Sequence, residues 1–192
     1  MDNTVGSLTP RERSIILGSL LGDGYLRIIP GRKNAFLEIN HSIKEKEYVD
    51  WKYQELKNLV KSSPKARKGN GQRVAYRFFT CQHPELTEFY KEFYQNGKKT
   101  VPRNLVFNPL MIGVWFMDDG SRTYRTYYLN TQQFDYHSQK RLIEMLKDQY
   151  RIECSLNRDK QYYRIRIRQN SAKEFKRLIG NYIIPEMRYK LG

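Results

Sequence analysis

Two short segments of this sequence end in an acid followed by a glycine. Residues 16–24 read ILGSLLGDG and residues 112–120 read IGVWFMDDG. If both are helices packed side by side, Asp23 and Asp119 meet at C-terminal helix ends, where negative charge is disfavoured. A divalent cation would relieve that repulsion, and carboxylates on hard metals are a common arrangement for phosphodiester hydrolysis. The alternative, that each aspartate only terminates its helix, is weaker because acids destabilise that position.

Two glycines in the first segment support helix packing. Gly18 and Gly22 lie four residues apart, on one helical face. They would let a second helix approach closely, and the natural partner is the second segment. We expect the glycine after each aspartate to supply the left-handed residue on which helices commonly end.

Both segments have recognisable helix starts. Thr9, Pro10 and Glu12 match a capping box with proline in the first turn. Asn108 and Pro109 begin the second helix in the same way. These signals place the two acid-ended segments on helices rather than strands.

The elements after each helix repeat in the same order, αββαββα, and the matching aspartates are 119 − 23 = 96 residues apart. An internal duplication is the economical explanation. We therefore predict an α+β fold with antiparallel sheets and two pseudo-symmetric halves, residues 1–101 and 102–192. The predicted strands cover residues 25–29, 35–40, 74–81, 123–130, 155–156 and 162–168, and the other helices cover residues 46–60, 84–94, 137–150 and 172–179.

The charge favours a nucleic-acid partner. Lys and Arg number 35 against 20 Asp and Glu, a formal net charge of +15. The excess is +7 before residue 100 (18 − 11) and +8 after it (17 − 9), as expected for a long polyanion lying across both halves. A merely soluble basic protein is the alternative. Two cysteines, with no Cys-x-x-Cys and no cluster with histidines, argue against a zinc site, and no apolar run is long enough to span a bilayer.

Several predicted strands carry basic residues on one face. Arg164, Arg166 and Arg168 alternate with apolar residues, so that a sheet could bury one face and present the other to a DNA groove. The basic segment 65–73 has the composition of a flexible hairpin that tracks phosphates. In both cases an ordinary solvated surface is the alternative.

The two acid-ended segments resemble the motifs of LAGLIDADG homing endonucleases, in the single-chain, intron-encoded branch that carries two motifs. Residues 115–121 (WFMDDGS) are similar to the second motif, residues 98–102 (KKTVP) to the basic-Val-Pro segment before it, and residues 185–191 (PEMRYKL) to the family's C-terminal ending. Val114 and Asp118 depart from the small residues usual in the second helix, which makes the predicted packing asymmetric.

The resemblance implies motif helices at the interface between the halves and saddle-shaped sheets over DNA. It implies Mg²⁺, for which Mn²⁺ would substitute, held by Asp23 and Asp119 with the carbonyls of Gly22 and Asp118. It further implies cleavage of both strands across the minor groove with short 3′ overhangs. Other catalytic positions that it suggests are a lysine near each scissile phosphate and a polar residue that orders water: Lys99, Lys190, His41 and Gln132.

Residues expected to contact DNA are the basic, aromatic and amide side chains of the predicted strands and loops. These are Tyr25, Arg27, Arg32, Lys33, Asn34, Arg73, Tyr76, Arg77, Arg122, Arg125, Tyr127, Arg158, Lys160, Arg164, Arg166 and Arg168.

Two other functions fit the same fold. An intron RNA maturase would share the basic surface without needing the aspartates, and a DNA-binding regulator should have lost at least one of them. Both acids are present, which favours a working endonuclease, expected as a monomer of two fused halves. With no presequence, an intracellular location is expected, in a bacterial cytoplasm, a chloroplast or a mitochondrion.

Overall fold

A computed structural model of the chain describes residues 6–69 and 71–192, which form two compact units. The first unit spans Met1–Lys91 and the second Glu92–Gly192. The boundary lies ten residues before the division predicted at residue 101, because the segment 92–101 packs with the second unit. Each unit is described by itself below.

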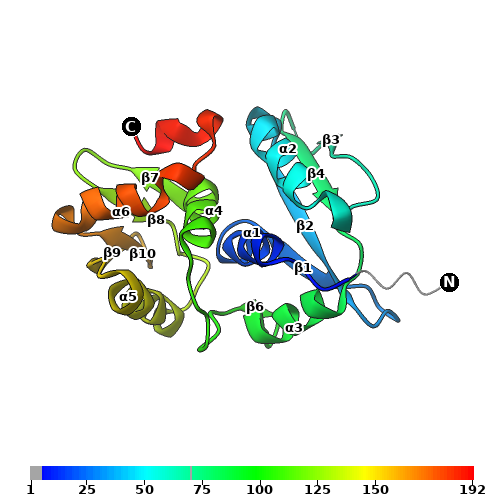
Figure 1. Cartoon of the computed structure of the whole chain (residues 1–192), viewed down its shortest axis with the longest axis horizontal. Coiled ribbons are helices and arrows are strands. Elements are labelled where there is room, and N and C mark those ends of the chain that lie inside the picture. The colour runs from blue at the N-terminus through cyan, green and yellow to red at the C-terminus, as the bar shows by residue number, and fades with distance from the viewer. Residues whose placement is uncertain (1–5, 70) are drawn as a thin grey trace. The chain divides into compact units, whose positions relative to one another are not determined.

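The first unit has the predicted order αββαββα (Figure 1). Its four-stranded antiparallel sheet has the strand order β1-β2-β4-β3. The elements are α1 (Pro10–Leu21), β1 (Tyr25–Ile28), β2 (Ala35–Ser42), α2 (Lys46–Glu55), β3 (Lys65–Lys68), β4 (Val74–Phe79) and α3 (Pro84–Phe93).

The second unit repeats this topology. Its sheet has the order β7-β8-β10-β9, which matches the first sheet strand for strand. The elements are α4 (Pro109–Asp119), β7 (Gly120–Arg122), β8 (Tyr127–Leu129), α5 (Tyr136–Tyr150), β9 (Cys154–Asp159), β10 (Tyr162–Ile167) and α6 (Ala172–Ile179), preceded by the hairpin β5 (Tyr94–Gln95) and β6 (Lys98–Lys99). The α+β fold with antiparallel sheets is therefore confirmed.

Both motif helices begin as predicted. The Thr9 hydroxyl accepts a hydrogen bond from the backbone N–H of Glu12, whose carboxylate accepts one from the Thr9 backbone. The Asn108 side chain accepts one from the backbone N–H of Met111 at 2.9 Å. These bonds satisfy N–H groups that would otherwise lack partners at a helix start.

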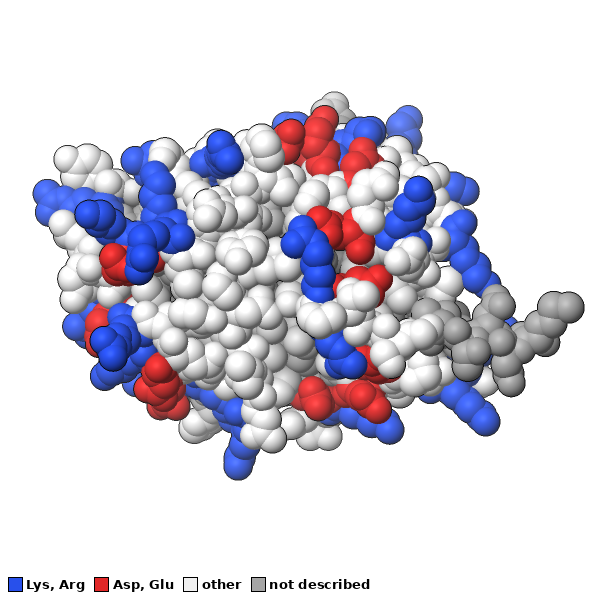
Figure 2. All heavy atoms as spheres, in the orientation of Figure 1, with Lys and Arg blue, Asp and Glu red and all other residues white. Residues whose placement is uncertain are grey.

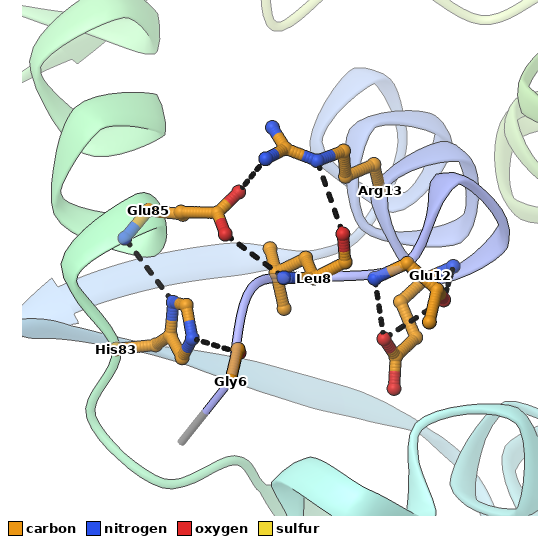
Figure 3. Close-up of polar contacts among 7 residues, drawn as sticks. Gly6, Leu8, Glu12, Arg13, His83 and Glu85 are labelled. Carbon is orange, nitrogen blue, oxygen red and sulfur yellow. Dashed lines mark hydrogen bonds and ion pairs between the residues drawn. The ribbon is translucent and has the colours of Figure 1, made fainter. Parts of the chain in front are cut away.

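The segment before α1 is fastened to the start of α3 (Figure 3). The Leu8 N–H donates to the Glu85 carboxylate at 2.8 Å, and Arg13 forms an ion pair with the same carboxylate. The buried His83 ring accepts a hydrogen bond from the Glu85 N–H through Nδ1, while its Nε2 lies 3.1 Å from the Gly6 carbonyl oxygen. This network sets where α1 begins in the first unit.

The helix ends differ from the prediction. Gly24 has no left-handed backbone, and Gly120 has φ −80°. A Cβ at Gly24 would lie 2.8 Å from the Ser19 carbonyl oxygen, and one at Gly120 would lie 2.2 Å from the Phe116 ring. The glycines are therefore required by close approach of the preceding helical turn and not by backbone conformation.

One face of each sheet packs on helices of its own unit. In the first unit, Phe78 contacts Tyr53 of α2, with ring centroids 5.9 Å apart. In the second, Phe116 of α4, Tyr127 of β8 and Phe175 of α6 form a cluster in which each pair of centroids is 5.6 Å apart. These aromatic contacts hold the motif helix α4 on its sheet.

Two strand boundaries were wrong in the prediction. Lys65–Lys68 is an edge strand, β3, paired with β4, and not part of a flexible loop. All four of its residues are exposed, so it lacks the apolar alternation that identifies strands. In the second unit, the expected strand 123–130 is the hairpin β7–β8, which turns at residues 123–126. Over the described residues, no helix has the length and apolar character needed to cross a bilayer.

Candidate functional site

Asp23 lies just after the first motif helix, beside a buried histidine. Its carboxylate oxygen is 3.6 Å from Nδ1 of His41, a residue that is 4% exposed at the end of β2. The same Nδ1 lies 3.2 Å from the Glu45 carboxylate. The Asp23 side chain is half exposed, so its carboxylate can reach a ligand from solvent while the imidazole stays fixed.

Asp119 is the last residue of α4 and has a different neighbour. Nε2 of Gln133 donates a hydrogen bond to the Asp119 carboxylate at 3.1 Å. Lys99, from β6, donates to Oε1 of Gln133 at 3.3 Å. The amide thus connects a cation to the acid.

Gln133 was not among the residues predicted from the sequence. The predicted residue, Gln132, instead donates its amide N–H to the Asp159 carboxylate at 2.8 Å, on β9. The two glutamines are adjacent in the turn after β8, and no local sequence signal distinguishes which of them turns toward Asp119.

Lys190 lies at the C-terminal end of the second motif helix. Its ammonium group donates to the carbonyl oxygens of Met117 and Asp118, the latter at 3.1 Å. Carbonyl oxygens at a helix end carry partial negative charge. This end of α4 therefore already holds one cation in the structure.

The donor types around the two acids fit a hard divalent cation. The first unit offers the Asp23 carboxylate with a histidine and a glutamate beside it. The second offers the Asp119 carboxylate and a cation-binding carbonyl at Asp118. Oxygen donors of this kind are preferred by Mg²⁺ and Mn²⁺.

The outer face of the first sheet, turned away from the helices, carries more basic than acidic side chains. The residues of this face alternate along β2 and β4 with Leu37 and Phe78, which are buried on the other face. Glu38 is 6% exposed and lies 3.1 Å from Arg27 and 3.7 Å from Arg77. This carboxylate fixes two guanidinium groups side by side on the face. The other outer-face residues, inferred from the register, are Tyr25, Phe36, Asn40, Lys65, Arg67 and Phe79.

The outer face of the second sheet carries Arg164 and Arg166, for which no ion pair with a carboxylate occurs among the residues that the structure describes. The guanidinium of Arg164 lies 3.9 Å from the ring centroid of Tyr128, and Arg166 pairs with Tyr128 in the register. Among described residues, Nε of Arg164 and Nε of Arg166 are buried without a hydrogen-bond partner. A buried guanidinium N–H group without a hydrogen-bond partner gains free energy from a ligand that supplies an acceptor, such as an anion.

Four predicted DNA-contact residues lie elsewhere. Tyr76 faces α2, where its hydroxyl donates to Asp50 at 2.9 Å. Tyr127 is in the core, and its hydroxyl donates to the Leu191 carbonyl. Arg122 and Arg158 pair with Tyr127 and Tyr163, which places both arginines on the helix side of the sheet.

The remaining predicted contacts lie in loops or next to the strands. Arg32, Lys33, Arg73, Arg125, Lys160 and Arg168 are exposed, whereas Asn34 accepts a hydrogen bond from Thr87. Figure 2 shows Lys and Arg side chains over both units in that view, in agreement with the even charge of the two halves. Glu38, Phe36 and Phe79 were missed, although alternation with Leu37 and Phe78 could have identified them.

Comparisons with known proteins identify the family of this chain. A model of the LAGLIDADG DNA endonuclease family matches residues 13–175. The cytochrome b mRNA maturase bI2 of Saccharomyces cerevisiae is 28% identical over 100% of this chain, which spans 50% of that protein's length. The probable intron-encoded endonuclease 1 of Wickerhamomyces canadensis is 28% identical over 96% of this chain and 85% of that protein.

A solved structure has the same fold over almost the whole length. The homing endonuclease I-WcaI, bound to its DNA recognition sequence, matches with a TM-score of 0.90 at 27% identity, covering 97% of this chain and 88% of that one. The family match begins inside α1 and ends inside α6, so it includes both αββαββα units and both acid-ended helices. The chain therefore belongs to the LAGLIDADG DNA endonuclease family.

Proposed function

We propose that this chain is a site-specific homing endonuclease that hydrolyses both strands of a long double-stranded DNA target and leaves short 3′ overhangs. The observation that carries the proposal is that each unit places an aspartate at or just after the end of its motif helix, beside other polar side chains. The likeness to I-WcaI and to an intron-encoded endonuclease supports it. A monomer suffices, because one chain supplies both units.

The metal-binding carboxylates in this proposal are Asp23 and Asp119, with the carbonyls of Gly22 and Asp118 as further donors. A bound Mg²⁺ or Mn²⁺ would supply Lewis-acid stabilisation of developing negative charge and an activated nucleophile at neutral pH. The other roles belong to the protein's side chains.

Lys99 and Lys190 offset the negative charge of the phosphates. Gln133, hydrogen-bonded to Asp119, is positioned to orient a water for in-line attack, and His41 takes the corresponding place beside Asp23. No covalent enzyme intermediate is required.

The test is substitution of each acid. Asp23→Asn and Asp119→Asn should each lower the cleavage rate by about a hundredfold or more while leaving DNA binding largely unchanged, because the amide keeps the shape and removes the charge. Asp148→Asn, at an exposed position on α5, is the matched control and should cut at the wild-type rate. Chelation should stop cutting, and added Mg²⁺ or Mn²⁺ should restore it. Wild-type cleavage in both variants would remove the proposed metal site.

A second function is supported by the relative named as a maturase. Under this alternative, the chain assists splicing of its host intron RNA. Splicing assays with the Asp119→Asn variant distinguish the maturase from the endonuclease. A maturase does not need this carboxylate, so the variant should still support splicing. The interior of an organelle or of a bacterial cell, where such introns are transcribed, is the compartment we propose.

A further inference from the structure

An apolar hollow with basic surroundings lies where the outer face of the first sheet meets the segments before β3 and after β4. The hollow has a volume of about 920 Å³. Ile29, Phe36 and Phe79 contribute apolar surface to it. Phe36 and Phe79 meet edge to face, with ring centroids 5.9 Å apart. The cations of its rim are Lys61, Lys65, Arg67 and Arg77.

Part of this apolar lining is exposed to solvent. Phe79 is 40% exposed and Ile29 is 46% exposed. Arg77 lies over the Phe79 ring at 5.1 Å, which holds the ring in place on the face. Apolar side chains gathered in a concave site with polar groups around them are typical of ligand-binding grooves.

The basic rim and the apolar floor together restrict the ligand. Four cations together favour a polyanion such as DNA. The apolar group that duplex DNA presents to a protein in its major groove is the 5-methyl group of thymine. Phosphates and the polar edges of the other bases offer no such group in the major groove, and the apolar C–H groups of the sugars are the same at every base pair.

We propose that the hollow formed by Ile29, Phe36 and Phe79 receives thymine methyl groups, and that the target therefore carries A·T base pairs in the half-site bound by the first unit. This inference rests on the proposed function. The hollow lies toward the Ile28 end of β1, whereas Asp23 precedes Tyr25 at the other end. The length of β1, about 10 Å, separates them. The thymines consequently lie outside the base pairs next to the cleavage point.

The experiment begins by selecting bound sequences from a random double-stranded DNA library with the wild-type chain in EDTA, which does not require cutting. Each thymine of the selected site is then replaced singly by 2′-deoxyuridine, which removes only the methyl group. Loss of one buried methyl should weaken binding about fourfold. We expect this loss at one or more thymines of one half-site.

Phe79→Ala should weaken binding to the thymine-containing site and abolish the further loss on uridine substitution. Tyr162→Ala, an exposed aromatic residue on the outer face of the other sheet, is the matched control and should keep the uridine effect. An equal uridine effect in wild type and Phe79→Ala would overturn the inference, as would the absence of any effect in wild type.

A second readout uses the wild-type chain alone. Cys81 also lines the hollow, and burial raises the pKa of the Cys154 thiol to about 12, so that Cys81 should give the fast reaction with a thiol reagent. The selected DNA should slow that reaction. An unchanged rate would mean that the hollow is uncovered in the complex. If no DNA sequence is selected at all, the proposed function fails, whereas a selected site without the methyl effect contradicts only the hollow.

Discussion

At the scale of single residues, the polar groups beside the two aspartates are not equivalent. Asp23 has a buried imidazole at 3.6 Å, whereas Asp119 has an exposed amide at 3.1 Å that is itself bonded to Lys99. The imidazole presents a single ring nitrogen to its carboxylate, whereas the amide offers a donor to Asp119 and an acceptor to Lys99 at the same time. The two units therefore bring different chemistry to the two strands that we propose they cut.

Gln133→Ala should lower the single-turnover cleavage rate by about tenfold or more, because it removes both the donor to Asp119 and the link to Lys99. Gln132→Ala is the matched control at the adjacent position and should change the rate less, since its amide bonds to Asp159. Rapid-quench measurement of product formation checks both. A larger loss for Gln132→Ala would restore that residue to the water-ordering role.

At the scale of elements, close packing of the preceding helical turn determines which residue can follow each motif aspartate. Glycine follows each aspartate because the preceding turn leaves no space for a Cβ. In the second unit the neighbouring group is the ring of Phe116, which also packs on Tyr127 and Phe175. The end of α4, the sheet and α6 are thus positioned by one aromatic cluster.

Gly120→Ala should lower the free energy of unfolding by about 1–3 kcal/mol, the range for forcing a methyl group into a filled site. The comparison is Gly180→Ala, at the end of α6, where a Cβ meets nothing within 4 Å and the backbone is already helical. That variant should be neutral or slightly stabilising. Urea unfolding measures both, and equal stability of the two variants would contradict the steric explanation.

Two tyrosines connect strands to other elements and should make the fold sensitive to high pH. Burial, followed by the hydrogen bond to Asp50, raises the pKa of Tyr76, and burial raises the pKa of Tyr127. A tyrosine whose pKa is raised in the folded state contributes to the free energy of unfolding. This contribution is fully present below the pKa of the unfolded chain, near 10, and is lost as the pH rises through the pKa of the folded state.

Phe substitutions at these two positions should therefore reduce the loss of stability between about pH 10 and the higher folded-state values. The measurement is thermal unfolding as a function of pH. Tyr124→Phe, at an exposed loop position, is the control and should retain the wild-type alkaline profile. An alkaline profile unchanged in the Tyr76 and Tyr127 variants would show that neither titration is linked to unfolding.

At the scale of the whole molecule, the charge of +15 is distributed over both units. The two outer faces use it differently. In the first unit Glu38 partly neutralises Arg27 and Arg77, whereas within the described ranges 6–69 and 71–192 no carboxylate pairs with Arg164 or Arg166. The second face should therefore contribute more of the attraction to phosphates, and the first more of the base discrimination.

DNA affinity should fall steeply with salt, with a log–log slope of several units, because contacts to phosphates release counterions. Titration of binding between about 50 and 200 mM salt measures the slope. Arg166→Ala should reduce its magnitude more than Glu174→Ala, a substitution at an exposed site on α6. A flat dependence in wild type would exclude the basic faces as the DNA-binding surface.

The sequence by itself determined the features that depend on local periodicity. The capping residues Thr9 and Asn108 predicted both helix starts, and the 96-residue spacing predicted two units of one topology. The alternation of Arg164 and Arg166 with Ile165 and Ile167 placed the arginines on an outer face. Such patterns are readable because each residue's face follows from its immediate neighbours.

Tertiary structure decided the features that depend on contacts between distant segments. The turn after β8 directs Gln133, and not Gln132, to Asp119. Tyr127 packs against Phe175 in the core and therefore does not face outward. The apolar hollow arises where residues from three separate strand ends converge. Local patterns do not specify which distant side chains meet, because strand register and turn conformation are set by the packing of the whole unit.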